Sequence, residues 1–136
     1  MQKVTREMVL QGYGYEVHVS ASEYGDDSVF IVASPTASEV SEAKALRMRL
    51  SEVKGETDPA KIDLGKALIA EEETRRFLIA KALTRGMAEE WTSGDVEKIR
   101  PAVIARLWKA VDQMIGFTAE AEESVRNFPK VQKDKS

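Results

Sequence analysis

The stretch DVEKIRPAVIARLWKAVDQMIGF, residues 95–117, predicts the principal helix of this protein. From Pro101 onward, large apolar residues recur at a spacing of three and four, which places them on one helix face. These residues are Val103, Ile104, Leu107, Trp108, Val111, Met114 and Ile115. Pro101 suits the first helical position because it has no N–H to lose, and Gly116 can close the last turn in the left-handed conformation. We expect this helix, within 95–116, to lie at the centre of the core.

Short elements flank the principal helix on both sides. Thr92 and Asp95 predict a short helical turn before it, and Pro101 disfavours the helical conformation at the preceding residue, so the two segments should meet at an angle. After Gly116 we expect a last helix over 118–128 with acidic residues in its first turn, where the helix dipole favours them. The polar residues 129–136 are expected to form a mobile tail.

The N-terminal part of the chain has the period of a β-strand. Tyr13, Tyr15, Val17 and Val19 alternate with small and polar residues, which is typical of a half-buried strand. Turn-forming residues follow at 23–27, and then a β-branched and aromatic run at 28–33. We therefore predict a β-hairpin over about 13–33. Because two strands alone are marginal in water, one face of the hairpin must pack on the helices.

Thr36 and Glu39 have the spacing of a capping box and predict the start of a helix over about 36–54. Its expected apolar stripe consists of Val40, Ala43, Leu46, Leu50 and Val53. Asp58 and Pro59 then predict the start of a longer helix over about 58–86. Its expected stripe is Ile62, Gly65, Ile69, Ala80 and Leu83.

The middle of the 58–86 segment is charged where its stripe should be apolar. Glu72, Glu73 and Arg76 occupy those positions, although the pairs of Glu71 with Arg75 and of Glu72 with Arg76 support a helix. Three interpretations stay open. The helix leaves the core at this point, it breaks into two, or these charges form salt bridges with a partner subunit.

Length and composition indicate one soluble domain. The chain has 136 residues, of which 43% are hydrophobic and 32% charged, and its net charge is −3. We expect residues 1–128 to form a single domain, mainly α, in which amphipathic helices pack as a small bundle with the N-terminal hairpin. The sequence has no basic-then-apolar leader and no apolar run long enough to span a membrane, which favours a cytoplasmic protein. Lys and Arg are interspersed with acids, which disfavours nucleic-acid binding.

No enzyme signature is present in the sequence. There is no cysteine, and the one histidine, His18, lies on the polar side of the predicted strand. The run Glu71-Glu72-Glu73 spreads around a helix and cannot converge on one ion, so we interpret it as a solvated face or as part of an intersubunit contact. We expect no catalytic residue, no cofactor and no metal site.

The order of elements, together with the run DVEKIRPAVIARLWKAVDQMIGF and its acidic flanks, resembles the small tail assembly chaperones of long-tailed bacteriophages and prophages. The resemblance implies a non-enzymatic helical protein of the host cytoplasm that binds the tape measure protein, recruits the tail tube protein and self-associates. It also implies that a longer product can be made by ribosomal frameshifting. It implies no residue-level binding motif.

The 58–86 segment has more large apolar residues than one packed face can take up, which favours an interaction surface. We expect an amphipathic helix of a client protein to dock in a groove between helices, with rim charges setting its register. The candidate protein-binding residues are Leu64, Leu68, Phe77, Leu78 and Trp91, and the candidate intersubunit charges are Glu72, Glu73 and Arg76. The alternatives are another phage structural protein, such as a connector, and a helical regulator that binds nucleic acid.

Overall fold

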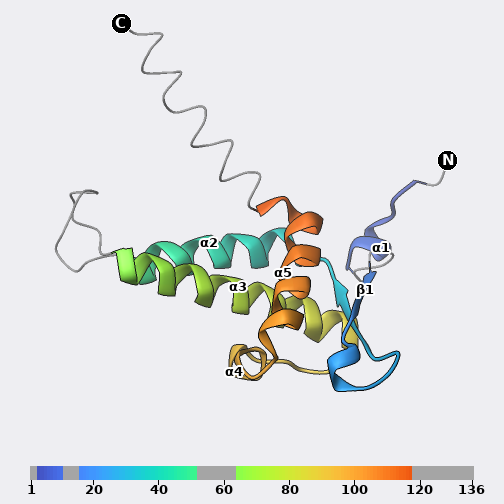
Figure 1. Cartoon of the computed structure of the whole chain (residues 1–136). Coiled ribbons are helices and arrows are strands. Elements are labelled where there is room, and N and C mark those ends of the chain that lie inside the picture. The colour runs from blue at the N-terminus through green and yellow to red at the C-terminus, as the bar shows by residue number, and fades with distance from the viewer. Residues whose placement is uncertain (1–2, 11–15, 52–63, 118–136) are drawn as a thin grey trace, which may run out of the picture.

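Helices α2, Ala37–Ser51, and α3, Leu64–Met87, pack side by side and form the long axis of the fold (Figure 1). The structure, a computed structural model, describes residues 3–10, 16–51 and 64–117. The other elements are α1 Arg6–Leu10, β1 Glu16–Ser20, the 3-10 turn Ser22–Tyr24, β2 Val29–Ala33, α4 Ser93–Glu97 and α5 Pro101–Ile115. The predicted fold class is confirmed: the protein is mainly α with a short antiparallel hairpin near its N-terminus.

The hairpin packs one face on the helices, as its alternating pattern predicts. Val17 pairs with Val32 and Val19 pairs with Phe30 across the two strands. Val19 and Val32 are buried, whereas His18 is exposed on the other face. The strands contact α3 and α5, so this face of the hairpin completes the apolar core.

Helix α5 buries the face that its spacing predicts. Val103, Leu107 and Val111 are fully buried, and the other apolar residues of the stripe are partly buried against the same core. Pro101 is the first helical residue, and Gly116 ends the helix in the left-handed conformation at φ 64° and ψ 30°. The local signals for the start and the end of this helix are therefore both confirmed.

The predicted capping boxes are present at the N-termini of the short helix α4 and of α2. The backbone N–H of Asp95 donates to the Thr92 hydroxyl, and the Asp95 carboxylate accepts from the Thr92 N–H. The Thr36 and Glu39 side chains form the same reciprocal bonds at α2. Arg85 of α3 also donates to Glu39, at 2.9 Å, so this cap fastens α2 to α3.

Helix α3 is continuous from Leu64 to Met87, so it does not break at its charged middle. The apolar stripe predicted for its first half is wrong, because Ile69 is 59% exposed and Gly65 is also exposed. Ala70 and Thr74 are buried instead. The reason is physical: two helices that pack closely turn small side chains toward each other, and Ala43 is the buried residue of α2.

Several predictions lie outside the described residues. These are the starts of the 13–33 hairpin and of the 58–86 helix, the end of the 36–54 helix, the 118–128 helix and the 129–136 tail.

Candidate protein-binding site

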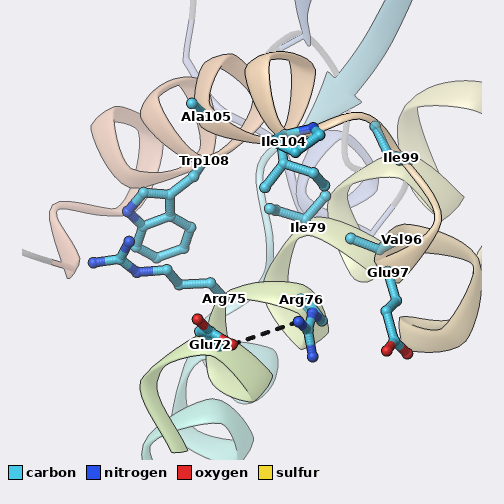
Figure 2. A pocket seen from close by; sticks show the side chains of 11 residues that line it. Glu72, Arg75, Arg76, Ile79, Val96, Glu97, Ile99, Ile104, Ala105 and Trp108 are labelled. Atoms are coloured by element: carbon cyan, nitrogen blue, oxygen red, sulfur yellow. Dashed lines mark ion pairs between the residues drawn. The ribbon is translucent and has the colours of Figure 1, made fainter. Parts of the chain in front are cut away.

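An open groove of about 520 Å³ lies between α3, α4 and α5 (Figure 2). Its volume is in the range of sites that take a small ligand or a few side chains of a partner. The lining residues are Glu72, Arg75, Arg76, Ile79, Val96, Glu97, Ile99, Pro101, Ile104, Ala105 and Trp108. We call this site the α3–α5 groove.

The floor of the α3–α5 groove is apolar. Ile79 of α3 and Val96 of α4 are fully buried and form its base, and Ile104 and Trp108 of α5 form its wall. Trp108 packs edge-on against Phe117, with ring centroids 6.0 Å apart, and this contact restrains the indole. Such a floor suits apolar side chains of a partner better than a polar substrate.

The rim of the groove is charged, and its arginines are already paired. The guanidinium of Arg75 lies 5.1 Å from the centroid of the Trp108 ring (Figure 2). It also contacts Glu71 at 3.5 Å. Arg76 contacts Glu73 at 2.6 Å and Glu72 at 3.6 Å. The arginines therefore cover the edge of the apolar floor without leaving an unpaired positive charge there.

The first turns of α3 carry a second apolar surface. Leu64, Leu68 and Ile69 are 74%, 61% and 59% exposed. We call these three residues the α3 apolar end. Met48 of α2, at the same end of the helix pair, is 66% exposed. Three large side chains in contact with solvent on two adjacent turns are costly unless another surface covers them, because each forgoes about 1.5–3 kcal/mol of burial.

Leu64 and Leu68 of the α3 apolar end lie on the same face of α3 as the residues that line the α3–α5 groove. Leu64, Leu68, Glu72, Arg75 and Ile79 follow one another at spacings of four, four, three and four. Residues at this spacing share one helix face. Leu64 and Ile79 are fifteen positions apart, so at about 1.5 Å per residue this face is about 22 Å long. It is apolar at both ends and charged in the middle.

The structure separates the predicted binding residues into three groups. Leu64 and Leu68 are exposed, as their placement on an interaction surface requires. Leu78 is fully buried, so its predicted place on that surface is wrong: it belongs to the face of α3 that packs in the core. Phe77 and Trp91 are partly buried against the core and do not line the groove. Trp91 packs edge-on against Phe30, at 5.5 Å between centroids.

The three predicted intersubunit charges lie at the edge of the groove. Glu72 and Arg76 line it, and Glu73 is the close partner of Arg76. That these charges reach a partner subunit stays a prediction.

Sequence reasoning did not predict the wall that α5 contributes to the groove. Ile104 belongs to a stripe expected to pack in the core, and Trp108 was considered as an interface anchor but favoured as a core residue. The available signal was Pro101, which turns the chain between α4 and α5 and so opens a space beside α3.

The chain matches no protein-family model, no curated protein and no solved structure. Among the described helices, none combines the length and the apolar character that a membrane crossing requires. Residues 3–10, 16–51 and 64–117 hold no group of three acidic or histidine side chains arranged to bind a metal ion.

Proposed function

We propose that this protein is a non-enzymatic assembly chaperone that binds a hydrophobic helical segment of another protein along the exposed face of α3. The observation that carries the proposal is the α3 apolar end, in which Leu64 and Leu68 are 74% and 61% exposed one turn apart. The apolar residues of an amphipathic client helix also recur one turn apart, so such a helix would bury the Leu64 and Leu68 side chains on docking.

The resemblance to phage tail assembly chaperones extends this proposal to a particular client. On that basis the client is the tape measure protein, the tail tube protein is recruited afterwards, and the chaperone works in the host cytoplasm and self-associates. By that resemblance the tape measure protein is long and hydrophobic, so exposed apolar surface on a small partner would keep it soluble during assembly.

Co-expression with the tape measure protein of the same genome tests the proposal. The double variant Leu64→Lys, Leu68→Lys places two charges on the α3 apolar end and should lower the yield of soluble client at least fivefold, because charged side chains oppose apolar docking. The measurement is the amount of client in the soluble fraction, per amount of folded chaperone.

The double variant Val4→Lys, Val9→Lys is the matched control. These two valines are 74% and 65% exposed and lie outside α3, so the control adds the same charge to an equally exposed surface. It should keep the client soluble. A client that is equally soluble with both double variants, or without the chaperone, would contradict the proposal.

A further inference from the structure

We propose that the α3–α5 groove binds an amphipathic helix of the client that carries a lysine or arginine beside its apolar stripe. This inference rests on the proposed function. It adds a second contact site and the requirement that the client helix carries a positive charge. The groove continues the face of α3 that begins with the α3 apolar end, so one client helix can occupy both.

The charge requirement follows from the carboxylates of the rim. Glu97, the last residue of α4, lines the groove, is exposed and forms no ion pair with another described residue. Glu72 faces the groove from α3 with its side chain 67% exposed, and its contact with Arg76 is the longer of the two that Arg76 makes. A lysine or arginine of the client can therefore form an ion pair with Glu97. Glu72 is available as a second partner, because Arg76 stays paired with Glu73.

The floor of the groove accounts for the apolar part of the client. Arg75 stacks on the Trp108 ring, and its side chain is 45% exposed, so it can swing outward while it stays close to Glu71. That movement uncovers the indole next to Ile104. Apolar side chains of the client would then contact Trp108, and its basic residue would contact Glu97 on the opposite rim.

A second copy of this chain fits the groove less well. In a two-fold contact centred on the groove, the cations that Glu97 of one copy would meet are Arg75 and Arg76 of the other, and these are already paired with Glu71 and Glu73 of their own chain. A client helix with a basic flank has the complementary charge.

A charge-swap experiment with two synthetic peptides tests the inference. Both are 18-residue amphipathic helices with the same leucine stripe; one carries lysines beside the stripe, and the other carries glutamates at those positions. We expect the lysine peptide to bind the wild-type chain more tightly by fluorescence anisotropy. Glu97→Lys should weaken the lysine peptide about three- to tenfold and strengthen the glutamate peptide by a similar factor.

Two further variants locate the binding site. Glu42→Lys makes the same charge change at an exposed position of α2 outside the groove and should alter neither affinity. Ala105→Gln fills part of the groove and should weaken both peptides about fivefold, whereas Ala102→Gln, exposed on the same helix but outside the groove, should weaken neither.

The outcomes separate this inference from the proposed function. If the client stays soluble and peptides bind, but Glu97→Lys shifts neither affinity, the groove contact is overturned and the proposed function stands. If neither peptide binds and the client is not kept soluble, the proposed function fails as well. If Glu97→Lys changes the sedimentation of the chain alone without changing peptide affinity, the groove binds a second copy, and the inference is again overturned.

Discussion

Gly86 sets how closely α3 approaches the hairpin. A Cβ atom at this position would lie 2.1 Å from the carbonyl oxygen of Ile31 and 2.8 Å from the Cα atom of Val32. The next residue, Met87, accepts a hydrogen bond at its sulfur from the Ile31 N–H at 3.2 Å. Only a residue without a side chain allows this contact between helix and strand.

Gly86→Ala should therefore destabilise the protein, although alanine is the better helix former by about 1 kcal/mol. The added methyl group meets backbone atoms that cannot move aside, and we expect the free energy of unfolding to fall by about 2–3 kcal/mol. Urea denaturation measures this change. Gly94→Ala is the control, because its Cβ would meet only the Thr92 hydroxyl at an ordinary 3.6 Å. Equal urea midpoints for the two variants would contradict this account.

Gly86 also marks the limit of sequence reasoning at this scale. A glycine near the end of an apolar pattern is typical of a helix end, but α3 continues through it to Met87. Glycine is needed at this position for the close approach to Ile31, which is far away in the chain and leaves no local signal. By contrast, Gly116 could be predicted as a helix end because that role depends only on its own neighbours.

At the scale of elements, an ion pair fastens the turn of the hairpin to α5. Arg106 donates to the Glu23 carboxylate and to the backbone carbonyl of Ser20, both at 2.9 Å. The hydrogen bonds from the Arg106 side chain, followed by one from the backbone of Glu23 itself, lower the pKa of Glu23 to about 2 from an ordinary value of 4.5. The turn is therefore held to α5 most firmly when this carboxylate is ionised.

This pKa predicts the direction of the pH dependence. Because the pKa is lower in the folded state than in the unfolded state, the contribution of Glu23 to stability is complete above pH 4.5 and is lost as the pH falls toward about 2. The variant Glu23→Gln should show a smaller loss of stability than the wild type over this pH range, measured by urea denaturation at each pH. If the free energy of unfolding falls equally with pH in the wild type and in Glu23→Gln, the ion pair does not contribute to this pH dependence.

Helix α3 shows what could and could not be predicted for an element. Its existence and its excess of apolar residues follow from the sequence, but the face that enters the core does not. Large apolar side chains such as Ile69 were expected in the core. The residues buried where α2 and α3 pack closely are instead the small Ala70 and Thr74. Helix α5 was predicted correctly because its seven large apolar residues leave a single face to bury.

For the whole molecule, the large apolar side chains divide between the buried core and an exposed surface. The hairpin, α5 and the second half of α3 contribute most of the core, while Leu64, Leu68 and Ile69 in the first turns of α3 stay exposed. The composition and the periodicities were sufficient to predict a mainly helical domain with a hairpin. The α3–α5 groove could not be predicted, because its lining comes from three helices whose arrangement depends on long-range contacts.

The most direct test of the account is methyl NMR of the chain during titration with the client segment. The account predicts that the methyl signals of Leu64, Leu68 and Ile104 shift together, because one client helix covers the α3 apolar end and the groove. The methyl signals of Val9 and Val29, which are exposed elsewhere, should stay in place. Shifts confined to these valines, or no shift while the client binds, would contradict the claim that α3 presents the binding face.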